Sequence, residues 1–73
     1  MKVIKRSGTT QEYDGKKITS AMQKAFDSVG KTCRQEVLRD LLSQVEQNLG
    51  EGPHTVEAIQ DMVERILMAN GYY

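Results

Sequence analysis

Three runs of apolar residues at helical spacing, each followed by a glycine, constrain the fold of this chain more than any other feature of its sequence. The glycines are Gly30, Gly50 and Gly71. Glycine is common just beyond a helix end because it adopts the left-handed conformation without a steric penalty. The pattern predicts three helices with the inner faces Ile18, Met22, Ala25 and Val29; Leu38, Leu41, Leu42, Val45 and Leu49; and Ile59, Met62, Val63, Ile66 and Leu67.

Each predicted helix also has a signal near its start. Asp14 precedes the first apolar run and is a favourable N-cap residue. Thr32 and Gln35 have the spacing of a capping box, so we expect the second helix to begin there. Glu57 lies in the first turn of the third helix, where a carboxylate interacts favourably with the helix dipole.

Short strands are expected around these helices. Residues 2–6 read as one strand, Ser7-Gly8-Thr9 as a turn, and residues 10–13 as the returning strand of a hairpin. Residues 54–56 follow a Gly-Pro pair and are a candidate third strand at the edge of the hairpin. A hairpin alone is marginally stable and must pack on something. The sequence therefore predicts an α+β fold in which a small N-terminal β-hairpin, or a three-stranded sheet, caps a bundle of three helices.

Size and composition narrow the possible functions. The 73 residues suit one small domain. Cys33 is the only cysteine and His54 the only histidine, so an intramolecular disulfide is excluded and a zinc site is not expected. No signal peptide or long apolar run is present, and we expect a cytoplasmic protein. Because Walker A, GxGxxG and Ser-His-Asp patterns are missing, we expect no catalytic residues and no enzyme activity in this chain.

Positive charge gathers near the N-terminus although the formal net charge is zero. Lys5 and Arg6 end the first predicted strand, and Lys16 and Lys17 open the first helix. We expect these four side chains to converge at one end of the sheet. Such a cluster suits a nucleoside triphosphate, because Lys and Arg form charge-assisted hydrogen bonds with phosphate. The alternative is that the lysines are ordinary solvated surface residues.

A bound adenine base would need an apolar slot and a few polar groups to orient it. Val3, Ile18, and Ile59 or Val56 are candidates for the slot. The candidates that would read the amino edge of the base are Gln11, Glu12 and Gln60. Each group also has a plainer interpretation, in which the apolar residues are core and Lys5 and Arg6 protect a strand edge from aggregation.

The sequence resembles the ATP-cone domain family over its whole length. Several separate motifs occur in the family's order: Val3-Ile4-Lys5-Arg6-x-Gly8, Tyr13-Asp14-x-x-Lys17-Ile18, Val56-Glu57-x-Ile59-Gln60-Asp61-x-Val63-Glu64 and Leu67-Met68-x-x-Gly71-Tyr72. The C-terminal motif is particularly similar to ATP-cones of ribonucleotide reductase large subunits. The overall pattern looks closest to the anaerobic, class III reductases.

The resemblance implies that residues 1–73 are one regulatory domain. It would bind ATP or dATP, with Mg²⁺ on the phosphates, and switch the activity of a reductase catalytic domain through its oligomeric state. By position, the family's nucleotide contacts would be Val3, Lys5, Arg6, Lys17, Ile18 and Gln60, followed by Gln11 and Val56. Family members continue beyond Gly-Tyr-Tyr into a fourth helix, whereas this sequence stops at Tyr73. We therefore expect weakened nucleotide binding and self-association through exposed helix faces.

Three other functions stay open at this point. The repressor of reductase genes also contains an ATP-cone, but its cone follows a zinc ribbon with paired cysteines. A protein-interaction or dimerisation module without a ligand would show concentration-dependent association and no response to nucleotide. A short nucleic-acid binder would show steeply salt-dependent binding, and the zero net charge argues against it.

Overall fold

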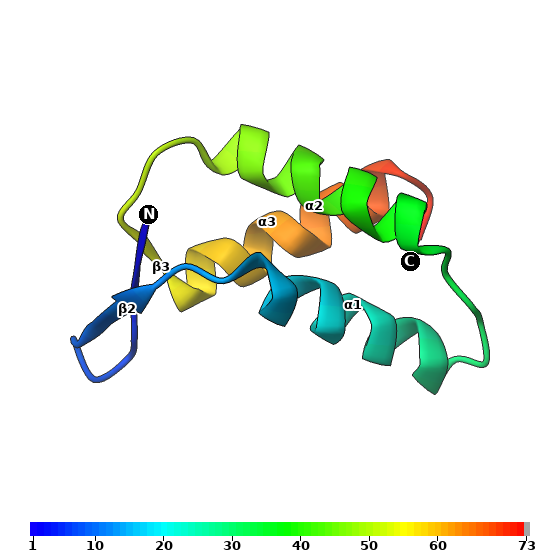
Figure 1. Cartoon of the computed structure of the whole chain (residues 1–73), viewed down its shortest axis with the longest axis horizontal. Coiled ribbons are helices and arrows are strands. Elements are labelled where there is room, and N and C mark those ends of the chain that lie inside the picture. Colours follow the sequence, from blue (N-terminus) through cyan, green and yellow to red (C-terminus); the bar gives the residue numbers. More distant parts are fainter. Residues whose placement is uncertain (73) are drawn as a thin grey trace.

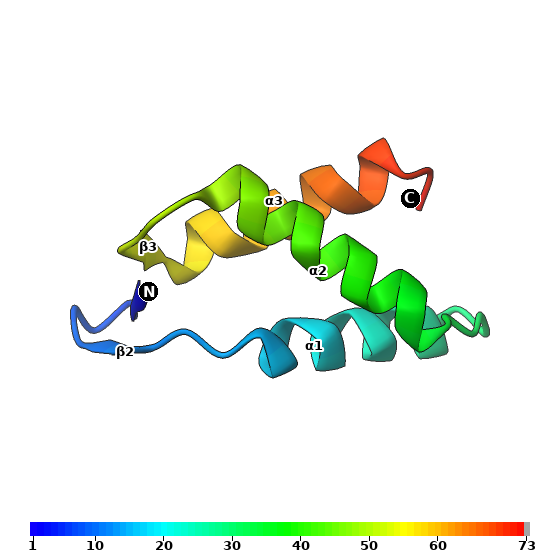
Figure 2. The same cartoon turned by 45° about the horizontal axis from the view of Figure 1, so that its top comes forward.

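The computed structural model describes residues 1–72 and has three helices with a small sheet at one end (Figures 1 and 2). In chain order the elements are β1 (Lys2–Ile4), β2 (Thr10–Glu12), α1 (Gly15–Ser28), α2 (Gln35–Leu49), β3 (His54–Thr55) and α3 (Val56–Ala69). This arrangement confirms the predicted α+β fold. In the described part of the chain, no helix has the length and apolar character that crossing a membrane requires.

The sheet joins the beginning of the chain to a segment that comes 51 residues later. Its strand order is β2-β1-β3. Strand β1 runs antiparallel to β2, with Val3 opposite Gln11, and parallel to β3, with Val3 also opposite His54. The predicted third strand is therefore confirmed and lies at the edge of the sheet. Its last predicted residue, Val56, instead opens α3.

The first strand is shorter than predicted, because the turn begins earlier. The Lys5 amide donates to the Thr9 carbonyl at 2.8 Å, and the Gly8 amide donates to the Lys5 carbonyl at 2.9 Å. These bonds close the hairpin turn directly after Ile4. Lys5 and Arg6 consequently belong to the turn and not to the strand.

Two of the three helix starts have a side-chain cap. Asp14 accepts a hydrogen bond from the Lys16 amide at 3.0 Å, as predicted, and Thr55 accepts one from the Ala58 amide at 3.1 Å. The predicted capping box at Thr32 is wrong, because α2 begins at Gln35 after an Arg34 that makes no side-chain cap. Residues 31–34 are not helical, so Thr32 precedes the first helical turn by too many residues to cap it.

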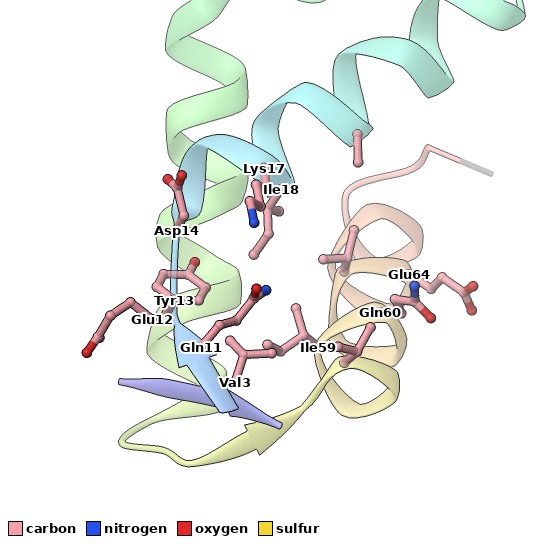
Figure 3. Close-up of a pocket in the computed structure, with 13 residues that line it drawn as sticks. Val3, Gln11, Glu12, Tyr13, Asp14, Lys17, Ile18, Ile59, Gln60 and Glu64 are labelled. Carbon is pink, nitrogen blue, oxygen red and sulfur yellow. The ribbon is translucent and has the colours of Figure 1, made fainter. Parts of the chain in front are cut away.

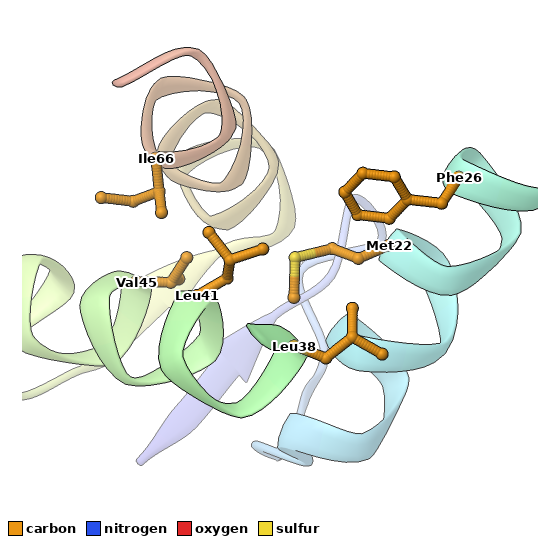
Figure 4. Packing of buried hydrophobic residues seen from close by; sticks show 6 residues of the cluster. All are labelled: Met22, Phe26, Leu38, Leu41, Val45 and Ile66. Atoms are coloured by element: carbon orange, nitrogen blue, oxygen red, sulfur yellow. The ribbon is translucent and has the colours of Figure 1, made fainter. Parts of the chain in front are cut away.

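The hydrophobic core lies along the seam where α2 meets the two other helices (Figure 4). Its buried cluster contains Met22, Phe26, Leu38, Leu41, Val45 and Ile66. The predicted inner faces of α2 and α3 are confirmed in outline. The inner face of α1 differs from the prediction near the C-terminal end of that helix. Phe26 is buried, whereas Ala25 and Val29 are exposed. The ring of Tyr72 packs edge-on against Phe26 with centroids 5.1 Å apart.

Candidate functional site: a cavity between the sheet and two helices

A cavity of about 470 Å³ lies between the sheet, the start of α1 and residues 56–64 of α3 (Figure 3). Ligand pockets in proteins typically have about 300–1,000 Å³. The residues that line it are Val3, Gln11, Glu12, Tyr13, Asp14, Lys17, Ile18, Ala21, Val56, Ile59, Gln60, Val63 and Glu64. They come from three separate parts of the sequence, so only the folded chain forms this cavity.

The walls of the cavity are mainly aliphatic. Val3 is 6% exposed on the central strand, and Ile59 is 8% exposed in the first turns of α3. Ile18 projects from α1 towards the space above them (Figure 3). The α3 residues that line the cavity recur at intervals of three and four, which places them on one face of that helix. These walls can hold a flat, apolar group such as a nucleobase.

The register of the sheet decides which polar side chains can reach the cavity. Gln11 lies opposite Val3, and residues that face each other across an antiparallel pair share one side of the sheet. The Gln11 amide accordingly points from β2 towards Ile18 and Lys17 (Figure 3). An amide in this position offers both a donor and an acceptor.

Glu12 behaves differently from its neighbour. It lies opposite Lys2 on the other side of the sheet, and its carboxylate accepts a hydrogen bond from the Lys2 ammonium group. This contact lowers the pKa of Glu12 below its ordinary value. The side chain points away from the cavity (Figure 3). Of the two candidates on β2 for reading a base, the geometry therefore favours Gln11.

The expected convergence of four positive charges is wrong. The hairpin turn and the start of α1 lie at opposite ends of β2, so Lys5 and Arg6 are separated from Lys16 and Lys17 (Figure 1). Lys17 is the one basic residue among those that line the cavity in the described chain. The carboxylates of Asp14 and Glu64 also belong to the lining, so the cavity itself is not strongly positive.

Arg6 forms an ion pair with the first turn of α3. Its guanidinium Nε donates to Glu57 Oε1 at 2.9 Å, which connects the hairpin turn to the first turn of α3. The hydrogen bond from Arg6 lowers the pKa of Glu57 below its ordinary value. Neither Lys5 nor Arg6 lines the cavity.

Tyr13 forms part of the cavity wall and has a buried hydroxyl group without a hydrogen-bond partner among residues 1–72. Burial, and then the nearby Glu46 carboxylate, raise the pKa of this hydroxyl above its ordinary value. The hydroxyl lies near Gly15, where an added Cβ would also come within 3.0 Å of Leu42 Cδ2. The start of α1 thus packs closely on α2 immediately behind the cavity.

The structure brings together eight of the ten predicted nucleotide contacts in this one cavity. They are Val3, Gln11, Glu12, Lys17, Ile18, Val56, Ile59 and Gln60. The sequence interpretation missed Tyr13, Asp14, Ala21, Val63 and Glu64, which also line it. Helical spacing contained a usable signal for two of these, because Ala21 follows Ile18 by three residues and Val63 follows Ile59 by four. Within residues 1–72, no group of three or more His, Cys, Asp and Glu side chains is placed to hold a metal ion.

Comparison with known proteins gives two relatives with the same name, ribonucleoside-diphosphate reductase subunit alpha. The protein from Chlamydia trachomatis serovar D is 29% identical over 85 residues, and the one from Chlamydia muridarum is 31% identical over 85 residues. Each alignment covers 100% of this chain but only 8% of the relative, so the chain spans a small part of these proteins. Both names specify a diphosphate reductase, and the expected similarity to the anaerobic class stays a prediction. The ATP cone domain family matches residues 1–73, and the chain therefore belongs to that family.

Proposed function

We propose that this chain is an allosteric regulatory domain that binds ATP or dATP in the cavity between the sheet, α1 and α3. ATP-cone domains bind these nucleotides as effectors, and the family match covers residues 1–73. The observation that carries the proposal is the gathering of eight predicted contact residues around one cavity of about 470 Å³. Those residues are far apart in the sequence, and the fold alone brings them together.

The chemistry of the lining supports one orientation of the nucleotide. The base and ribose would lie between Val3, Ile18 and Ile59, with the Gln11 amide facing the polar edge of the base. The phosphates would extend past Lys17 to the rim, and Lys5 and Arg6, which do not line the cavity, would have to turn towards them from the hairpin. Mg²⁺ would be held by the phosphates, which reduces their repulsion with the acidic residues of the lining.

In a longer protein this domain would regulate a reductase catalytic domain through assembly. A typical coupling free energy between a ligand and an oligomeric state is about 1–3 kcal/mol. Such coupling needs a surface that a partner covers, and Val29 and Met68 are 67% and 60% exposed. The chain itself would bind nucleotide without hydrolysing it.

Calorimetric titration and thermal unfolding with ATP, dATP and GTP, each with Mg²⁺, test the proposal. At a ligand concentration about one hundred times Kd, ATP or dATP should stabilise the chain by about 2.7 kcal/mol. Lys17→Ala should weaken binding about tenfold or more, because it removes a charge-assisted hydrogen bond. Lys24→Ala is the matched control, because Lys24 is exposed on the same helix but does not line the cavity.

The same experiment separates the competing functions. Absence of any shift with millimolar ATP and dATP would refute nucleotide binding. If association of the chain then proved concentration-dependent, an interaction module would be the better description. Equal responses to GTP and ATP would refute recognition of the adenine base by the Gln11 amide.

A further inference from the structure

One ion pair joins the hairpin turn to the first turn of α3, next to residues that line the cavity. Arg6 Nε donates to Glu57 Oε1 at 2.9 Å, although the two residues are 51 positions apart in the sequence. Their side chains are 82% and 49% exposed. The contact uses only Nε, so the two terminal nitrogens of the guanidinium group have no ion-pair partner among the described residues.

Glu57 is well placed to influence a ligand in the cavity. It directly follows Val56 and precedes Gln60 by one helical turn, and both of these residues line the cavity. It also lies at the N-terminal end of α3, where the helix dipole otherwise favours an anion. Arg6 is therefore held at the first turn of α3, outside the cavity lining, with its positive charge already matched by a carboxylate.

We propose that Glu57 attenuates nucleotide binding by competing with the ligand's phosphates for Arg6. This inference rests on the proposed function and concerns the strength of phosphate recognition. A phosphate that recruits Arg6 must share or replace the Glu57 contact. A ligand without phosphates does not make this exchange. Glu57 thus sets how much each phosphate adds to affinity.

The size of the effect follows from the exposure of the pair. Exposed ion pairs in proteins change equilibrium constants by at most about fivefold. Exchange of the pair for a ligand contact is feasible, because a single exposed hydrogen bond is broken and no buried charge is left behind. Added salt screens the exposed ion pair, so the effect should shrink as ionic strength rises.

Titrations of Glu57→Gln with ATP and adenosine, at low and high salt, test the inference. The variant should bind ATP about two- to fivefold more tightly than the wild type at low salt and adenosine equally well. Glu36→Gln is the matched control, because it removes the same charge from the first turn of α2, outside the cavity. It should leave both affinities unchanged. Circular dichroism verifies that each variant is folded.

The same substitution made in an Arg6→Ala variant tests whether Arg6 is the residue for which Glu57 and the phosphates compete. Arg6→Ala should weaken ATP binding, and adding Glu57→Gln to it should give little further gain. A full gain in the absence of Arg6 would overturn the inference in favour of general repulsion. Weaker or unchanged ATP binding by Glu57→Gln alone would also overturn it, and weaker binding would mean that Glu57 orients Arg6. A wild-type chain that binds no adenine nucleotide would instead refute the proposed function, and this inference with it.

Discussion

Leu41→Ala should remove most of the stability of the isolated chain. Leu41 is 1% exposed and lies in the buried cluster that joins all three helices. Truncation of a buried leucine to alanine costs about 2–5 kcal/mol, because the lost contacts leave a cavity. A domain of this size usually has only about 3–5 kcal/mol of net stability. The variant should therefore melt about 8–40 °C lower, at about 4–8 °C for each kcal/mol.

The nucleotide offers an internal check on this reasoning. No residue of α2 lines the cavity of the proposed site. Leu41→Ala should therefore leave the binding residues in place once the chain is folded. Saturating ATP should then restore about 2.7 kcal/mol at one hundred times Kd. Thermal unfolding followed by circular dichroism, with and without ATP, measures both the stability lost in Leu41→Ala and the stability that ATP restores.

The control for this experiment is Met68→Ala. Met68 is 60% exposed on α3, and surface substitutions of this kind usually change stability by less than about 0.5 kcal/mol. The reasoning is refuted if Leu41→Ala costs less than about 1 kcal/mol, or if Met68→Ala costs as much as Leu41→Ala. Either result would mean that the seam along α2 is not the stabilising core.

Two further predictions concern the junction between β2 and α1. Asp14→Ala should cost about 1 kcal/mol in urea unfolding, because the Lys16 amide loses its acceptor, and Asp14→Asn should retain most of that stability. Equal losses in both variants would contradict the capping role. The raised pKa of Tyr13 means that the folded state keeps its proton at a pH where the unfolded chain has lost it. The corresponding stability is fully present below the ordinary tyrosine pKa of about 10 and declines as the pH rises above it. Tyr13→Phe should flatten this alkaline decline, and an unchanged urea midpoint profile between pH 8 and 11 would contradict the assignment.

Local signals in the sequence predicted the elements well, because their causes are local. The glycine beyond each helix and the Asp14 cap act within a few residues of the boundaries that they set. The prediction of a capping box was wrong because residue spacing alone does not fix where a helix begins. Thr32 and Gln35 have the right spacing, but the residues between α1 and α2 follow an extended path that spacing alone does not reveal.

The parts of the site that escaped prediction depend on tertiary contacts. Gln11 and Glu12 are equivalent candidates in the sequence, and only the pairing of Val3 with Gln11 directs one inward and the other outward. The contact between Arg6 and Glu57 spans 51 positions, and no spacing pattern in the sequence indicates it. Composition placed the basic residues near the N-terminus, but it did not reveal that β2 separates them into two groups.

The parallel pairing of β1 with β3 has a consequence for the biosynthesis of the domain. Val3 stands on one wall of the cavity and Ile59 on another, and His54 pairs with Val3 between them. A growing polypeptide therefore cannot form the cavity until α3 has emerged from the ribosome, however early β1 is made. A single proteolytic cut between α2 and β3 would likewise divide the two walls between separate fragments. The nucleotide binding proposed for this site would consequently require the completed and intact domain.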